Sequence, residues 1–162
     1  MRLTLLQRLL IALPMTALVV GVFVLYTRRE STTGRYKNVC LSNLRAIGAV
    51  NAMYWSDNDD HMPLENWIDA LDQIMKNPSH MDCPDVMKTQ KHFGYAMLLG
   101  VAGLEVGKVK EPEKSVMYFE TDALGRNVVA NLAARSGRHS NGSFLVFFDT
   151  HARYRKLGEE VK

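Results

Sequence analysis

Residues 143–157 read SFLVFFDTHARYRKL and carry the strongest β-strand pattern in the chain. The first half is apolar and aromatic up to Asp149, which is typical of a buried strand. Residues 152–157 alternate apolar and basic side chains, as a half-buried edge strand does. Because only Thr150 and His151 separate the two runs, we expect an antiparallel hairpin.

Towards the N-terminus, further elements lead up to this hairpin. Residues 115–120, SVMYFE, predict another buried strand after the turn signal at residues 110–113. Apolar side chains recur every three or four residues over 36–55, and a second helix carries Trp67, Leu71, Ile74 and Met75 on its buried face. Residues 79–107 predict loops with short extended pieces, such as residues 93–96. Helices followed by a small antiparallel sheet make an α+β fold. The expected core contains Trp55, Trp67, Tyr118, Phe119, Phe144 and Phe147.

The first thirty residues differ from the rest. Residues 9–26, LLIALPMTALVVGVFVLY, contain no charged side chain. A helix crosses the hydrocarbon core of a bilayer with about 20 residues, so Leu9–Tyr26 is just long enough. A cleaved signal peptide would end in a small-x-small site, and a soluble core helix would keep a polar stripe; the run has neither. We therefore expect a membrane anchor over 1–30, a hinge over 31–35 and a domain over 36–162.

Charge and cysteine content narrow the possible partners and the compartment. The formal net charge is only +3 and the basic residues are scattered, so nucleic-acid binding is not expected. Cys40 and Cys83 fit one disulfide in an oxidising compartment, or two inert thiols in the cytosol. We favour the disulfide. The two cysteines alone do not predict zinc, because no Cys-x-x-Cys or neighbouring histidine pair supplies further ligands.

Two groups of side chains are candidate sites. His139, Asp149 and His151 flank one strand and are a possible metal site, although we favour hydrogen bonds that lock the hairpin. Asp57, Asp59 and Asp60 offer oxygen ligands for calcium, but the spaced EF-hand pattern is missing, so a polar turn at a helix end is the simpler interpretation. No resident cofactor is expected.

The motifs that mark common enzymes are missing from the sequence. It contains no Gly-x-Ser-x-Gly, no phosphate-binding glycine loop and no His-Glu-x-x-His. We therefore do not expect an enzyme.

Several motifs in order resemble type IV pilin-like, or pseudopilin-like, proteins of the bacterial envelope. The resemblance covers residues 36–157, and its most specific element is His139 followed after nine residues by Asp149-Thr150, where the family has Asp-Gly. Its other elements are CLSNLRAIG at 40–48, Tyr54, Asp57-Asn58-Asp59, Pro63, Trp67, Cys83-Pro84, Gly94-Tyr95, Val109–Pro112 and Arg138-His139. The resemblance implies a pilin-like fold at the inner membrane with the domain in the periplasm. The charges flanking the apolar run do not decide this orientation.

The chain departs from the family pattern at two places. Thr150 replaces the glycine of the hairpin turn, and a β-branched residue resists the positive φ that such turns require. The turn is therefore expected to shift its geometry or to carry strain. At the N-terminus, Arg2 and Gln7 stand where prepilins have the cleavage-site glycine and a glutamate. We therefore expect the N-terminal segment to remain uncleaved.

Two functions from different classes follow from these observations. The leading hypothesis is a membrane-anchored structural or interaction protein, associated with a type II secretion or type IV pilus-like system. The alternative is a small metal-dependent or hydrolytic envelope enzyme that uses His139, Asp149 and His151.

Overall fold

The computed structural model describes residues 5–75, 82–87, 93–123 and 125–161. The chain forms two compact units, Met1–Arg35 and Tyr36–Lys162. The second unit begins where the sequence predicts the start of the domain. Helix α1 (Leu5–Asp57) continues through residues 31–35, where the sequence predicts a hinge.

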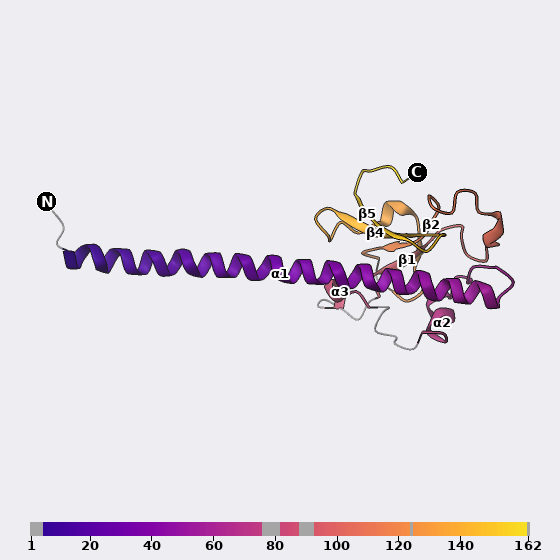
Figure 1. Cartoon of the computed structure of the whole chain (residues 1–162), viewed down its shortest axis with the longest axis horizontal. Coiled ribbons are helices and arrows are strands. Elements are labelled where there is room, and N and C mark those ends of the chain that lie inside the picture. Colours follow the sequence, from indigo (N-terminus) through magenta and orange to yellow (C-terminus); the bar gives the residue numbers. More distant parts are fainter. Residues whose placement is uncertain (1–4, 76–81, 88–92, 124, 162) are drawn as a thin grey trace. The chain divides into compact units, whose positions relative to one another are not determined.

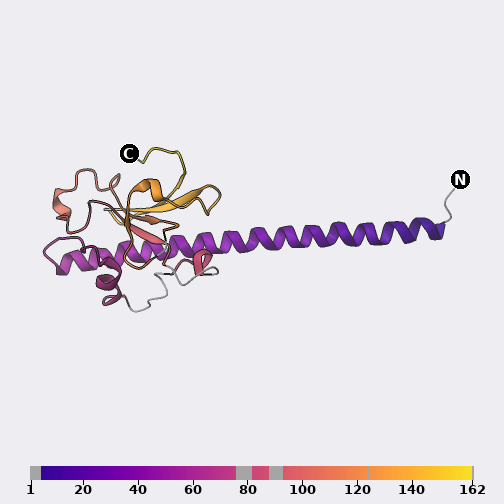
Figure 2. The same ribbon diagram turned by 180° about the vertical axis from the view of Figure 1, so that it is seen from behind.

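The second half of α1 is the helix on which the domain is built. Cys40, Leu44, Ile47 and Asn51 are spaced by three or four residues, so they share one face, and all four are fully or almost fully buried. This part of α1 lies along the sheet (Figures 1 and 2). Gly48 allows the close approach: a Cβ added there would lie 2.9 Å from Val146 Cγ1.

The predicted N-terminal transmembrane helix is wrong. Among the residues that the structure describes, no helix has the length and apolar character needed to cross a membrane. The apolar run with described side chains covers the twelve residues from Pro14 to Leu25. The ends of the predicted span, residues 9–13 and 26, lie outside the described side chains.

The sheet has five strands in the order β3-β1-β2-β4-β5. The strands are β1 (Tyr95–Leu98), β2 (Val116–Glu120), β3 (Val129–Ala130), β4 (Gly142–Phe147) and β5 (Ala152–Lys156). One face packs on α1 through Tyr118 and Val146. A smaller apolar cluster, which includes Phe119 and Leu145, covers the other face.

The sheet is mixed, so the prediction of a purely antiparallel sheet is wrong. β3 runs parallel to β1, and every other pairing is antiparallel. The N–H groups of Met97 and Leu99 donate to the carbonyls of Val128 and Ala130, each at 2.9 Å. A two-residue strand has too few residues to show an alternating pattern, and this is why the sequence gives no signal for it.

The remaining helices are short. α2 (Trp67–Asp72) is shorter than the sequence predicts, although Ile74 and Met75 still donate to the Leu71 carbonyl. α3 (Pro84–Met87) begins directly after Cys83. Single 3-10 turns occupy Val106–Lys108 and Leu132–Ala134.

The hairpin between β4 and β5 closes with three residues rather than the predicted two. Phe147 N–H donates to the His151 carbonyl at 3.1 Å, and Thr150 N–H donates to the Phe147 carbonyl at 2.8 Å. Thr150 has φ 70°, in the left-handed region. A turn followed by a left-handed residue is the usual three-residue hairpin loop, and that last position favours glycine. The turn thus has a different geometry from the two-residue turn, as one of the two expected outcomes, and Thr150 adopts the positive φ that a β-branched residue resists.

Candidate functional site

Four polar or sulfur-bearing side chains meet inside the domain. They come from four segments: Cys40 from α1, Cys83 from the residue before α3, Glu120 from the end of β2, and His139 from the loop before β4. All four residues are 0% exposed. One ligand atom from each lies within 4.8 Å of all the others. We call these four residues the buried cluster.

Direct contacts join the members of the buried cluster in pairs. The Sγ atoms of Cys40 and Cys83 are 2.7 Å apart. His139 Nε2 lies 2.9 Å from Glu120 Oε1. The other carboxylate oxygen, Oε2, accepts the backbone N–H of Phe144 at 2.7 Å. Glu120 is therefore held at both oxygens, one of them by the backbone of β4.

Local structure explains how these side chains reach one point. Cys40 lies one turn before Leu44 on the buried face of α1. Gly94 has φ 74°, and a Cβ there would lie 2.9 Å from Cys83 Cβ, so only glycine leaves room for Cys83. Arg138 Nη2 donates to the carbonyls of Gly94 at 2.7 Å and Thr121 at 2.9 Å. Arg138 thus fixes the loop that carries His139 against the ends of β1 and β2.

The two thiols lie close together without a covalent bond. No disulfide joins Cys40 and Cys83, because the 2.7 Å between their sulfurs exceeds the roughly 2.05 Å of the disulfide that the sequence analysis favours. The hydrogen bond with Cys83, followed by burial, raises the pKa of the Cys40 thiol. Burial likewise raises the pKa of the neighbouring Tyr95 hydroxyl. The surroundings therefore favour the neutral form of the Cys40 thiol.

His139, Asp149 and His151 do not form one site. His139 precedes β4, whereas Asp149 and His151 follow it at the opposite end of the strand. Asp149 Oδ1 accepts the backbone N–H of His151 at 3.2 Å and also contacts the His151 ring nitrogen Nδ1. The His151 ring stacks on Phe147 with centroids 4.4 Å apart. Asp149 and His151 thus brace the turn, and His139 belongs to the buried cluster.

The acidic segment after α1 serves as the end of that helix. Asp59 and Asp60 have φ 51° and 57°, and Asp60 N–H donates to the Trp55 carbonyl at 2.8 Å. His61 Nδ1 lies 2.6 Å from the Asp59 carbonyl oxygen. In the described part of the chain, the carboxylates of Asp57, Asp59 and Asp60 do not gather into a group that could hold an ion.

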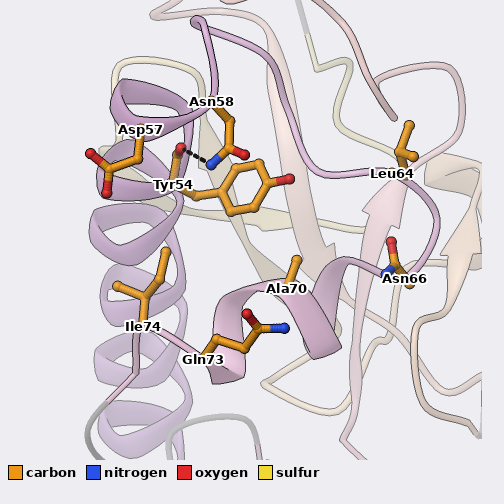
Figure 3. A pocket seen from close by; sticks show the side chains of 8 residues that line it. All are labelled: Tyr54, Asp57, Asn58, Leu64, Asn66, Ala70, Gln73 and Ile74. Atoms are coloured by element: carbon orange, nitrogen blue, oxygen red, sulfur yellow. Dashed lines mark hydrogen bonds between the residues drawn. The ribbon is translucent and has the colours of Figure 1, made fainter.

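A polar pocket lies between the end of α1 and α2. Its volume is about 450 Å³, and it is lined by Tyr54, Asp57, Asn58, Leu64, Asn66, Ala70, Gln73 and Ile74. Figure 3 shows the Gln73 amide and the Tyr54 ring facing this space from opposite walls. Asn58 Nδ2 donates to the Tyr54 carbonyl at 2.7 Å, so part of the polar lining is already engaged.

The N-terminal part of α1 presents a continuous apolar surface. Every residue from Pro14 to Leu25 is exposed. The large apolar side chains among them are between 42% and 69% exposed: Met15, Leu18, Val19, Val20, Val22, Phe23, Val24 and Leu25. Contiguous exposed apolar surface of this extent is rare on monomeric soluble proteins.

The sequence identifies three members of the buried cluster as residues of interest but does not group them. It predicts that Cys40 and Cys83 pair, and it assigns His139 to the hairpin. Glu120 is missed altogether, although a single carboxylate ending the apolar run SVMYFE is a signal, because a buried acid needs a partner.

Comparison of the chain with protein-family models, with curated proteins and with solved structures finds no match. What the chain does has therefore to be inferred from its own residues and surfaces.

Proposed function

We propose that the chain is a pilin-like structural or interaction protein of the bacterial envelope. Its domain, residues 36–162, lies outside the cytoplasm at the inner membrane. The apolar part of α1 binds an apolar helix of an envelope partner, such as a component of a type II secretion or type IV pilus-like system. The observation that carries this proposal is the exposed apolar surface of Pro14–Leu25.

The physical argument begins with the free energy of covering that surface. Burial of apolar area gains about 25 cal/mol per Å², and a helix that is apolar on all sides has no face suited to water. A helix is a fitting occupant because Ala17 and Gly21 are one turn apart and small. A Cβ added at Gly21 meets nothing within 4 Å, so a second backbone has room to approach there.

The architecture of the domain supports the same proposal. The resemblance implies a pilin-like fold with a type IV pilin-type N-terminal helix. In the domain, Leu44 and Ile47 of α1 pack against Tyr118 of β2 and Val146 of β4. The exposed apolar residues Pro14–Leu25 belong to the other unit of the chain, outside the core of the domain.

Charge substitutions test the proposed surface. Leu18→Glu introduces a charge at a side chain that is 67% exposed in the apolar segment, and Leu99→Glu is the matched control at 57% exposed in the domain. With the full chain produced in bacteria, we expect wild type and Leu99→Glu in the washed envelope fraction. The amount of the Leu18→Glu variant in that fraction should be lower by about tenfold, which corresponds to a loss of about 1.4 kcal/mol in binding free energy. Equal retention of both variants would overturn the proposal.

Two further measurements test which molecule covers the apolar surface of α1 and in which compartment the domain lies. A photo-crosslinking side chain at Val22 should give a protein adduct of discrete mass, and adducts with lipid alone would overturn the helix partner. Protease added to intact spheroplasts should digest the domain. Protection of the domain until the cells are lysed would overturn the assignment to the outer face of the inner membrane.

A further inference from the structure

We propose that the buried cluster of Cys40, Cys83, Glu120 and His139 is a structural zinc site. Two thiolates, one imidazole and one carboxylate are all established zinc ligands, and four such ligands complete its coordination. The site is independent of the apolar surface on α1, so it stands or falls separately from the proposed function.

The spacing of the ligand atoms suits a single small cation. With bonds of about 2.0–2.3 Å, the ligands of tetrahedral zinc lie roughly 3.3–3.8 Å from one another. The four ligand atoms here already fit within 4.8 Å. The closest pairs, Cys40 Sγ to Cys83 Sγ at 2.7 Å and His139 Nε2 to Glu120 Oε1 at 2.9 Å, need to widen by about 1 Å or less. The widest pairs, at up to 4.8 Å, would have to close by about 1 Å.

A bound cation would contact all four side chains of the buried cluster, whereas a disulfide would involve only the two cysteines. A bond between Cys40 and Cys83 would leave the buried Glu120 carboxylate with two partners, His139 Nε2 and the Phe144 N–H. Buried carboxylates are costly unless they are paired or coordinate a metal. A divalent ion would contact the carboxylate, the imidazole and both sulfurs at once, and it is therefore the occupant that we propose.

The surroundings of the cluster are built like those of a structural metal site. The Phe144 N–H holds Glu120 Oε2, so Oε1 remains directed at the other ligand atoms. Such outer contacts orient metal ligands. Because all four residues are 0% exposed, no coordination position opens to solvent, which is typical of structural rather than catalytic zinc.

The proton balance of binding is simple. Zinc binds to the two sulfurs as both thiols lose their protons to solvent. His139 binds through Nε2, so the proton that Nε2 shares with Glu120 Oε1 is given up there and the neutral ring carries its proton on Nδ1. Glu120 binds as the carboxylate. Two protons leave for each ion bound, and no oxidant or reductant takes part.

The test measures metal on the full-length protein, purified without chelator. We expect one zinc per chain by mass spectrometry of the metal, and sulfur-to-cobalt charge-transfer absorption after exchange with Co²⁺. Removal of the metal should lower Tm by about 10 °C or more. The double variant Cys40→Ala, Cys83→Ala keeps small apolar side chains in the core and should lose the metal. The control His151→Gln, at the other end of β4, should keep it.

Two results would overturn the proposal. One is an intact mass two hydrogens below that of the reduced chain after rapid thiol trapping, which identifies a Cys40–Cys83 disulfide. The other is zinc that is missing while both thiols are free, or that persists in the double variant. If the double variant fails to fold, His139→Gln replaces it, with circular dichroism to establish the fold and cobalt absorption to report the site.

Discussion

Replacing Thr150 with glycine should stabilise the domain. Thr150 is held at φ 70° by the hairpin, and the left-handed region costs a residue with a Cβ about 1–2 kcal/mol. Glycine removes that cost but loses about 0.5–1 kcal/mol through the greater freedom of the unfolded chain. We therefore expect a net gain of about 0.5–1 kcal/mol in the free energy of unfolding, and a rise in Tm of about 2–4 °C.

The hydrogen bonds of the turn do not change the expected gain in stability, because the Thr150 side chain is not needed for them. Thr150 bonds through its backbone, as its N–H donates to the Phe147 carbonyl and its carbonyl faces Gly48. Glycine keeps both groups. The measurement is urea denaturation followed by circular dichroism, with the slope m compared between variants so that a change in the unfolded state is noticed.

Two control variants separate the backbone effect from others. Thr150→Ala keeps the Cβ and should gain little. Asn127→Gly relieves a similar φ of 57°, yet it should lose stability, because the Asn127 amide oxygen accepts the Ile68 N–H at 2.7 Å. The reasoning is refuted if Thr150→Gly gains nothing, or if Thr150→Ala gains as much.

Three further predictions follow, two of them for the core and one for a hydrogen-bonded network on the surface. Gly48→Ala should destabilise the domain by about 1–3 kcal/mol in urea denaturation, because the new Cβ would lie 2.9 Å from Val146 Cγ1 and 3.3 Å from the Thr150 carbonyl oxygen. Gly107→Ala, where nothing lies within 4 Å, is its control and should be neutral within about 0.5 kcal/mol. Asn51→Ala should cost about 1–3 kcal/mol, because the buried Tyr118 hydroxyl, which donates to Asn51 Oδ1 at 2.8 Å, would lose its acceptor. Tyr118→Phe in the same chain should recover part of that loss in a double-mutant cycle, and strict additivity would contradict the coupling. The side-chain amide of Asn127, followed by the Arg126 guanidinium, lowers the pKa of Asp69, so this carboxyl contributes stability above its unfolded pKa that is lost as pH falls through its folded pKa. Asn127→Ala should move the Asp69 pKa upward in an NMR titration, and an unchanged pKa would assign the shift to Arg126 alone.

The elements with strong periodicity could be predicted from sequence. The hairpin strands appear close to their predicted bounds, and the helix predicted over residues 36–55 ends close to its predicted end, although α1 begins much earlier, at Leu5. Each of these segments has an apolar pattern long enough to be recognised. β3 could not be predicted, because two residues, Val129 and Ala130, carry no pattern. Its place is set by β1 and by Trp67, whose Nε1–H donates to the Val128 carbonyl at 3.0 Å.

The buried cluster depends on contacts between residues far apart in the sequence. The register of β2 on β4 pairs Phe119 with Leu145, which brings Glu120 beside Phe144. A slip of one residue would turn Glu120 to the other face of the sheet. No local pattern reports that register, and so the sequence shows Cys40, Cys83, Glu120 and His139 without showing that they meet.

The close packing of α1 on the sheet has a practical consequence for making fragments of this protein. Cys40, Leu44, Ile47 and Asn51 are part of the core, so a cut between residues 36 and 57 would strip one face of the sheet and unfold the remainder. A stable piece has to keep the helix from residue 36 onward. Limited proteolysis should accordingly trim the chain up to that point and then stop.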